Sequence, residues 1–444
     1  MSSSVPRRRL LGLAAAAVGT AGLGGCRVRP EAASRSARSP AASVSAQPST
    51  VQLPVVSFGP LRLPHVVEGF EHRYPGIKLV QTMPGAKPFW VQMLDAPLVA
   101  TFYQFAPLDS DLRALNFNPA LLLPGSVEPY VRKGQTLALP FSEIPWAVRW
   151  RTDAFAAAAL QPPRPDWGFA DFRNACAALQ ALSASGRLRG LHGALAPVVT
   201  GTPAIPAGGH PAHAGPVYVG ALSYPGLWQA FVWGFGGSLV ANGQFHLTDP
   251  ATVRGLSALV ELTRDFAVSP ADALAGSYAM ALSLYQPGGL AANWKWARLP
   301  RFPVDPVIPT VSVAQGLATT DHPKPPAADL VTATAQYLLW FYTAEATALL
   351  VAAGTPPALA GAAVQTEYWA RRQGDGAVGD WRNFRDCYAG FPFIPFATMY
   401  SAIDQVLAGA VDLRSALATA EQAMNAHRDR QEKGFTFALP YIGQ

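Results

Sequence analysis

Cysteine and charged residues are scarce in this sequence of 444 residues. It holds only three cysteines, Cys26, Cys176 and Cys387, and charged side chains make up 14% of the chain. So few thiols exclude a disulfide-rich scaffold. The pairing of Cys176 with Cys387 stays open, because two sequence positions do not show whether two thiols meet in space. The alternative is a pair of free thiols, with Cys176 buried in a helix.

The sequence also lacks the short motifs that mark common catalytic and nucleotide-binding sites. It contains no GxSxG, no HExxH, no P-loop and no CxxC, and no pair of acids stands out by its context. The histidine pair His210 and His213 has no acidic or cysteine neighbour, so we expect a solvated loop there and not a metal site. We expect no cofactor. These absences favour a protein that is not an enzyme. They are weak by themselves, because acids that are distant in sequence often meet in space.

The apolar stretch at the N-terminus is too short for a permanent membrane span, which needs ~20 apolar residues. It runs from Leu10 to Ala21 behind Arg7, Arg8 and Arg9, the pattern of an export signal. The adjacent arginines are typical of twin-arginine signals, and the general export route stays open. Leu23-Gly24-Gly25-Cys26 resembles the lipobox of bacterial lipoproteins. We therefore expect residues 1–26 to be a lipoprotein signal peptide, with Cys26 lipidated and the protein held on the outer side of the cell membrane.

Excess positive charge is missing from the body of the chain. Residues 1–50 hold seven of the 34 basic residues and one of the 28 acidic residues, so the remainder carries 27 of each. The net charge of +6 therefore belongs to the leader and to residues 27–50. That second segment contains almost nothing that could be buried, and we expect a disordered tether. A formally neutral body gives no indication of nucleic-acid binding.

The body, residues 51–444, is longer than one hydrophobic core usually organises, so two domains are expected. Short β-like runs alternate with helical patterns, as in α/β folds with mainly parallel sheets. Val66, Phe70 and Tyr74 recur at helical spacing and are followed by Pro75-Gly76, where a helix should end. The NG pair in LVANGQF predicts a hairpin, and TDP just after it predicts the start of a helix.

Several segments, in this order, resemble the extracellular solute-binding proteins of family 1, which include the maltose-binding proteins of ABC importers. The matching segments are FEHRYPGIKL, LALPFSEIPWAVRWRTDAF, PDWGFADF, GFGGSLVANGQFHLTDPATVRGLSALVEL and GSYAMAL. They cover nearly the whole body. The sequence departs from the family at Trp150-Arg151-Thr152-Asp153 and at Leu284-Tyr285-Gln286-Pro287, which puts the usual ligand set in doubt.

The resemblance implies a periplasmic-binding-protein-like fold of type II, an α/β fold with two lobes joined by three crossings. The first lobe would comprise residues 51–144 and 278–314, and the second lobe residues 145–277 and 315–444. The crossings would fall near Glu143–Ala147, Ala275–Ser277 and Ser312–Ala318. The ligand would lie between the lobes, and closure about these hinges would retain it.

Sugars expose C–H faces and many hydroxyls, so a sugar site needs flat aromatic rings and short polar side chains. The eleven tryptophans of the chain provide many candidates. The expected ligand-binding residues are Gln104, Asp109, Glu143, Trp146, Trp228, Tyr285, Asn293, Trp294 and Trp296. Each has a structural alternative in the core or in a surface loop. Trp340 and Trp369 stand in helical patterns, and we expect them to be structural.

The implied partners are a small-molecule ligand, which the family suggests is a sugar, and the permease subunits of an importer; the body would act as a monomer. Two alternatives stay open. One is an exported carbohydrate-active enzyme. The other keeps the fold for a sensory role or for a different ligand, such as a glycerol phosphate, a polyamine or iron. The segments expected to line the cleft are rich in aromatic residues and poor in basic clusters, apart from Arg149, Arg151, Lys295 and Arg298, and an anionic sugar stays open.

Overall fold

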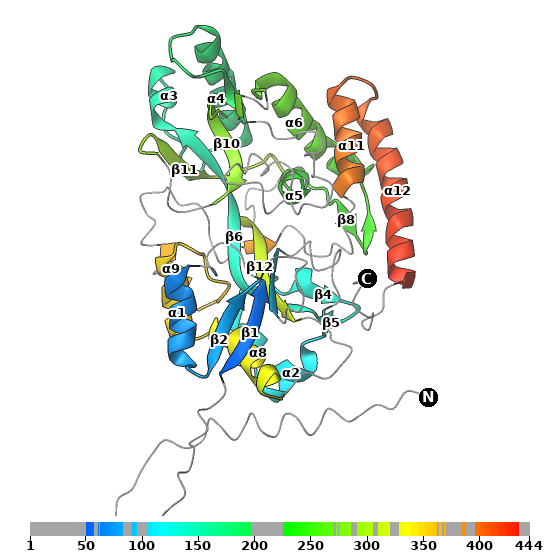
Figure 1. The fold of residues 1–444 in the computed structure, drawn as a ribbon. Helices are drawn as coiled ribbons and strands as arrows, with labels where there is room; N and C mark the ends of the chain where they lie inside the picture. Colours follow the sequence, from blue (N-terminus) through cyan, green and yellow to red (C-terminus); the bar gives the residue numbers. More distant parts are fainter. Residues whose placement is uncertain are drawn as a thin grey trace, which may run out of the picture.

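The fold consists of two lobes that share one long strand (Figure 1). The computed structural model describes residues 50–56, 61, 63–82, 91–95, 105–196, 225–269, 272–273, 275–285, 291–304, 310–319, 328–361, 364–365, 368–369, 384–386 and 396–434. The shared strand is β6 (Ala138–Arg151). It runs from the lower lobe to the upper lobe and pairs with different strands in each.

The lower lobe is an α/β layer built on the first strands of the chain. Its elements are β1 (Val51–Val56), α1 (Pro64–Arg73), β2 (Ile77–Gln81), β3 (Val91–Asp95), α2 (Asp109–Ala114), η5 (Pro119–Leu121), η6 (Glu128–Tyr130), β4 (Val131–Arg132), β5 (Gln135–Thr136), β12 (Thr310–Thr319), α8 (Ala328–Trp340), α9 (Ala344–Ala352) and β13 (Phe384–Asp386). β1 is parallel to β2 and β3, and β12 is antiparallel to β3 and β6.

Aromatic side chains on helices fill the core of the lower lobe. The ring of Phe70, on α1, lies 5.0 Å from that of Tyr337 and 5.5 Å from that of Trp340, both on α8. These rings belong to the same buried cluster as Leu53 and Val55 of β1. α1 begins at Pro64, and the first turn of a helix is the place where proline is tolerated. The helix ends at Arg73, before Pro75-Gly76, as its sequence pattern predicts. Trp340 is structural, as expected.

The upper lobe places helices over the upper half of β6. Its elements are α3 (Thr152–Ala157), α4 (Phe169–Ala184), β7 (Gly193–Leu195), α5 (Pro225–Gly234), β8 (Val240–Ala241), β9 (Gln244–Phe245), α6 (Pro250–Phe266), β10 (Tyr278–Leu284), β11 (Trp294–Arg298), α11 (Phe396–Leu407) and α12 (Leu413–Gly434). The full sheet has the strand order β2-β1-β3-β12-β6-β10-β7, with β11 also on β6 and β13 on β12. Cys176 of α4 is fully buried in the upper core as a free thiol, and Cys387 lies outside the described residues.

Local signals in the upper lobe are realised where they were predicted. Asn242 and Gly243 both have positive φ, 51° and 71°, and join β8 to β9 as the hairpin that the NG pair predicts. The Asp249 carboxylate caps α6 by accepting from the N–H groups of Ala251 and Thr252 at 2.9 and 3.1 Å. Gly255 allows α6 to approach α5 closely, because a Cβ there would lie 2.6 Å from the Cα of Val232.

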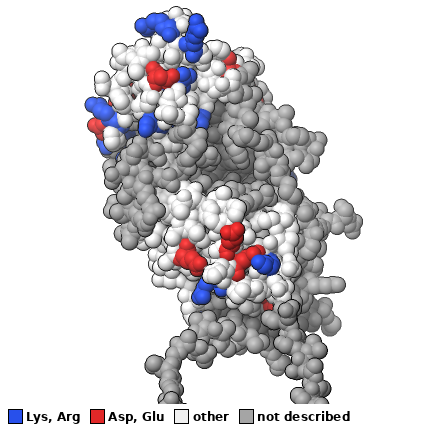
Figure 2. Space-filling view, turned by 60° about the vertical axis from the view of Figure 1, so that its left-hand side comes forward, with Lys and Arg blue, Asp and Glu red and all other residues white. Residues whose placement is uncertain are grey.

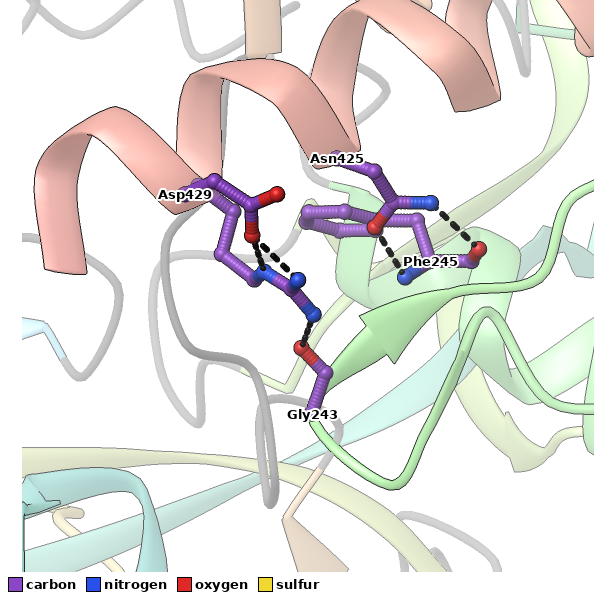
Figure 3. A network of polar contacts seen from close by, with 5 residues as sticks. Gly243, Phe245, Asn425 and Asp429 are labelled. Atoms are coloured by element: carbon purple, nitrogen blue, oxygen red, sulfur yellow. Dashed lines mark hydrogen bonds and ion pairs between the residues drawn. The ribbon is translucent and has the colours of Figure 1, made fainter.

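The C-terminal helix α12 holds this hairpin through side-chain contacts to its backbone (Figure 3). The Asn425 amide accepts from the N–H of Phe245 at 2.9 Å and donates to its carbonyl at 3.0 Å. Arg428 donates to the carbonyl of Gly243 at 2.7 Å and pairs with Asp429. Glu421, one helical turn before Asn425, accepts hydrogen bonds from the N–H and the hydroxyl of Thr248. The hairpin is therefore fixed to a helix whose contacting residue, Asn425, lies 180 residues away in the sequence.

The packing places two segments differently from the expected lobe boundaries. Residues 278–284 form β10, which pairs with β6 at Trp146–Trp150 and contributes to the upper core. α8 and α9 contribute to the lower core. The expected crossings at 275–277 and 312–318 are not confirmed, because Ser277 leads directly into β10 and because β12 pairs with the lower part of β6. Strand pairing decides which lobe each of these segments belongs to, and the hydropathy pattern of the sequence does not show which strands pair.

Candidate ligand site at the junction of the lobes

β6 passes from one core to the other within a few residues. Leu139 and Phe141 are buried in the lower cluster, whereas Trp146 and Val148 are buried in the upper cluster. Side chains alternate between the two faces of a strand. In the upper lobe, Trp146, Val148 and Trp150 therefore face the helices, and Ala147, Arg149 and Arg151 lie on the opposite face. The sequence LPFSEIPWAVRWR encodes this change of surroundings in a single strand.

An aromatic cluster lies on that opposite face, at the place where the lobes meet. Ring centroids of Tyr285 and Trp296 are 5.3 Å apart, and those of Tyr285 and Trp369 are 5.9 Å apart. Ala147 of β6, Val351 of α9 and Tyr368 complete the group. We call these six residues the junction cluster. It combines side chains of the upper sheet with side chains that follow α9 of the lower lobe.

The segment that carries Trp369 is fixed to β6 by buried hydrogen bonds. Gln365 is fully buried, and its amide donates to the carbonyls of Pro357 and Leu359 at 2.8 and 2.7 Å. Its oxygen accepts from the indole N–H of Trp369 at 3.1 Å. The hydroxyl of Ser142, on β6, donates to the carbonyl of Pro356 at 2.7 Å. Trp369 is thereby positioned relative to the crossing strand, which a purely local pattern does not reveal.

A second aromatic pair lies on the helical side of the junction. Trp228 of α5 is fully buried and contacts Tyr400 of α11, with centroids 5.7 Å apart in a T-shaped arrangement. Burial raises the pKa of the Tyr400 hydroxyl above its usual range. α5 contacts β12, so this pair lies near the lower lobe. The indole N–H groups of Trp146, Trp228 and Trp296 are buried, and none has a hydrogen-bond partner within the part of the chain that the structure describes.

Two of the polar candidates have structural partners. The Asp109 carboxylate accepts from the N–H and the hydroxyl of Thr136 at 3.0 and 3.1 Å, which ties the start of α2 to β5. Asn293 donates to Asp153 at 3.3 Å. Hydrogen bonding to Arg151 is the main reason why the pKa of the Asp153 carboxyl lies below its usual value.

The remaining candidates are distributed between the junction and the outer part of the sheet. Glu143 is buried in β6, and its N–H donates to the carbonyl of Pro356 at 3.2 Å. Trp294 lies farther from the junction and contacts Tyr278, with centroids 5.4 Å apart. Gln104 and Cys26 lie outside the described residues, as does the histidine pair at 210 and 213. The structure thus brings Tyr285 and Trp296 together.

Ser269, His192 and Asp272 form a polar group whose contacts differ from those of a catalytic triad. Asp272 lies 2.5 Å from Nδ1 of His192 and accepts from the hydroxyl of Ser269 at 2.6 Å. A triad requires the serine hydroxyl to bond to the histidine. Among the residues that the structure describes, no three His, Cys, Asp or Glu side chains form a possible metal site. None of the helices described has the length and apolar character needed to cross a bilayer.

Comparison with known proteins identifies the fold. No family model and no curated protein matches the chain. An ABC substrate-binding protein from Listeria monocytogenes in complex with cycloalternan has a TM-score of 0.64 and 16% identity, over 86% of this chain and 99% of that one. A solute-binding protein from Thermotoga lettingae bound with α-D-tagatose has a TM-score of 0.63 and 16% identity, over 85% and 100%.

A third similar structure is a complex with glycerophosphocholine. UgpB from Mycobacterium tuberculosis in complex with glycerophosphocholine has a TM-score of 0.61 and 16% identity, over 86% of this chain and 99% of that one. The first two of these structures are described as a substrate-binding and a solute-binding protein rather than as enzymes. The chain therefore has the two-lobe α/β fold of ABC-importer solute-binding proteins, and the resemblance expected from its sequence is confirmed at the level of the fold.

Proposed function

We propose that this chain is the extracytoplasmic substrate-binding protein of an ABC importer, and that it captures a sugar or oligosaccharide between its lobes. The observation that carries the proposal is the junction cluster, in which aromatic rings from both lobes meet beside β6, the strand that the lobes share. Solved structures with the same fold hold cycloalternan, tagatose and D-mannitol, which supports this class of ligand.

Tyr285 and Trp296, with Trp146 and Trp228 on the helical side, are the side chains that we assign to the ligand. All four are at least 97% buried, so ligand entry would require the lobes to separate. Buried indole N–H groups without partners are costly, about 1–3 kcal/mol each. Hydroxyls of a sugar, or water in an open form, would accept hydrogen bonds from them. Closure on the ligand would follow from its contacts with both lobes.

The packing supports a revised division of the chain into lobes. In our proposal the lower lobe comprises the described residues within 51–144, 310–319, 328–361 and 384–386, and the upper lobe comprises those within 145–304 and 396–434. The export signal, the lipidation of Cys26 and docking to permease subunits remain part of the proposal. The leader sequence supports the first two, and the fold supports the third.

A thermal-shift screen tests the proposed function directly. A chain that begins at residue 27 retains every described residue, and a ligand that binds only its folded form raises the unfolding midpoint. We expect a clear rise with at least one sugar, sugar acid, sugar phosphate or oligosaccharide. X-ray scattering of the same sample should show a decrease in the radius of gyration when that ligand is added. A flat response to the whole panel, with hydrolysis of a chromogenic glycoside, would support the enzyme alternative.

A further inference from the structure

Arg149 of β6 has a positive charge that no carboxylate within the described residues balances. It is partly buried, and its Nε is buried without a hydrogen-bond partner there. Placing a charge in a protein interior is costly unless an opposite charge or several hydrogen bonds compensate it. A partly buried, unneutralised guanidinium in the middle of a strand therefore requires an explanation.

Two aromatic residues hold this guanidinium in place. Its central carbon lies 4.7 Å from the ring centroid of Trp294 and 5.6 Å from that of Tyr278. The guanidinium also donates a hydrogen bond to the hydroxyl of Tyr278. Ring faces attract a cation but do not neutralise it. The side chain is thus fixed in orientation and retains its full charge.

Arg151 provides an internal comparison, because it lies on the same face of the same strand. Its Nε and one Nη donate to the two carboxylate oxygens of Asp153 at 3.1 and 2.6 Å. A local acid therefore neutralises Arg151, whereas the partners of Arg149, two residues earlier, are aromatic within the part of the chain that the structure describes. The two arginines have the same chemistry and different electrostatic surroundings.

The register of the strands places Arg149 beside the junction cluster. Arg149 is opposite Trp296 on β11 and opposite Ala281 on β10. Ala147, a member of the junction cluster, is two residues away on the same face, a distance of about 7 Å along the strand. Arg298 is opposite Ala147 and adds a second basic side chain to this face. The Arg149 guanidinium extends along this face towards Trp294, so a ligand that runs from the junction cluster in that direction would bring one substituent to it.

We propose that Arg149 binds an anionic group of the transported ligand, either a carboxylate or a phosphate, next to the aromatic junction cluster. This inference rests on the proposed function, since it assumes a ligand at the junction. The planar guanidinium matches both kinds of anion with paired hydrogen bonds. The substrate class is accordingly acidic sugars or phosphorylated sugars and polyols, rather than neutral sugars alone.

Matched ligand pairs test the inference. Glucose is compared with glucuronate and glucose 6-phosphate, and glycerol with glycerol 3-phosphate, by calorimetry on the chain that begins at residue 27. We expect an anionic member to bind about tenfold or more tightly than its neutral counterpart. Arg149→Met should abolish this preference and leave the affinity for the neutral member within about twofold. Raising the salt concentration should weaken the binding of the anionic ligand more than the binding of the neutral one.

Two further variants separate a binding role from a structural one. Arg151→Met removes an arginine from the same face that Asp153 already neutralises, and it should retain the preference for the anion. Arg149→Lys keeps the charge without the planar fork and should retain part of the preference. If Arg149→Met fails to fold, the ratio of anionic to neutral affinity in Arg149→Lys tests the inference instead.

Each outcome distinguishes the inference from the proposed function. If Arg149→Met lowers the unfolding midpoint but leaves the ratio of anionic to neutral affinity unchanged, Arg149 is a structural support and the inference is wrong. If neutral members bind and no anionic member is preferred, the inference is wrong and the proposed function stands. If no sugar, acid or phosphate binds at all, both are wrong.

Discussion

The ring of Trp369 lies 5.9 Å from that of Tyr285, so the segment after α9 of the lower lobe contacts the end of β10 of the upper lobe. Gln365 positions Trp369 from one side, and Trp296 packs against Tyr285 from the other. Contact between the lobes at this point depends on a few large rings.

Replacing Tyr285 by leucine should weaken ligand binding about tenfold, or about 1.4 kcal/mol, because leucine fills space but offers no flat face for stacking. Calorimetry with the ligand found in the screen measures the change. Phe70→Leu is the matched control, since it removes a buried ring from the lower core, far from the junction. That control should lower stability and leave affinity unchanged. Equal affinities for the Tyr285 variant and the unmodified protein would remove Tyr285 from the site.

Gln365→Leu should lower the free energy of unfolding by about 2–3 kcal/mol, because the carbonyls of Pro357 and Leu359 and the indole N–H of Trp369 would lose their buried partner. Urea denaturation followed by tryptophan fluorescence measures the difference. Gln405→Leu serves as the control, because Gln405 is exposed and bonds only weakly to Ser401 at 3.3 Å. A change below about 0.5 kcal/mol in the Gln365 variant would mean that the network contributes little.

Asn425→Ala should release the β8–β9 hairpin from α12, because both backbone bonds to Phe245 are lost. We expect a loss of about 1–2 kcal/mol in the free energy of unfolding. Hydrogen exchange of the amides at 239–248 should become faster. Gln422→Ala, on an exposed position of the same helix, should change neither quantity. Unchanged exchange in the Asn425 variant would show that other contacts hold the hairpin.

The pair of Arg151 and Asp153 should make a small contribution to stability that depends on pH. The pKa of Asp153 is lowered in the folded protein from its ordinary value of 3.8. Its contribution is therefore fully present above that value and is lost as the pH falls below it towards the lowered pKa. Asp153→Asn should remove this part of the acid dependence in urea midpoints measured between pH 2 and pH 6. Parallel curves for both proteins would contradict the assignment.

Local chemistry explains which parts of the fold the sequence predicts well. α1, the hairpin at Asn242-Gly243 and the start of α6 at Asp249 depend on neighbouring residues, and each forms at the expected place. The lobe boundaries depend on which strands pair, and there the expected division departs from the packing. β10 and α8 each have the hydrophobic pattern of a buried element, and an element with that pattern could be packed in either lobe.

The candidate site divides in the same way. Aromatic composition pointed to Tyr285 and Trp296, which the structure brings together. Trp369, expected to be structural because of its helical pattern, joins them, and no sequence signal connects it with β10. Asp109 and Asn293 are occupied by structural partners that lie 27 and 140 residues away.

By itself the sequence determined the export signal pattern, the neutral body, the α/β alternation and the local starts and ends of helices, since these depend on residue type and short-range spacing. Only the tertiary structure decided which segments form each lobe, which rings meet at the junction, and that Asp153 neutralises Arg151 while no carboxylate among the described residues pairs with Arg149. The physical reason is that strand register and packing bring together residues far apart in the chain, and hydrophobic pattern is the same for many such arrangements.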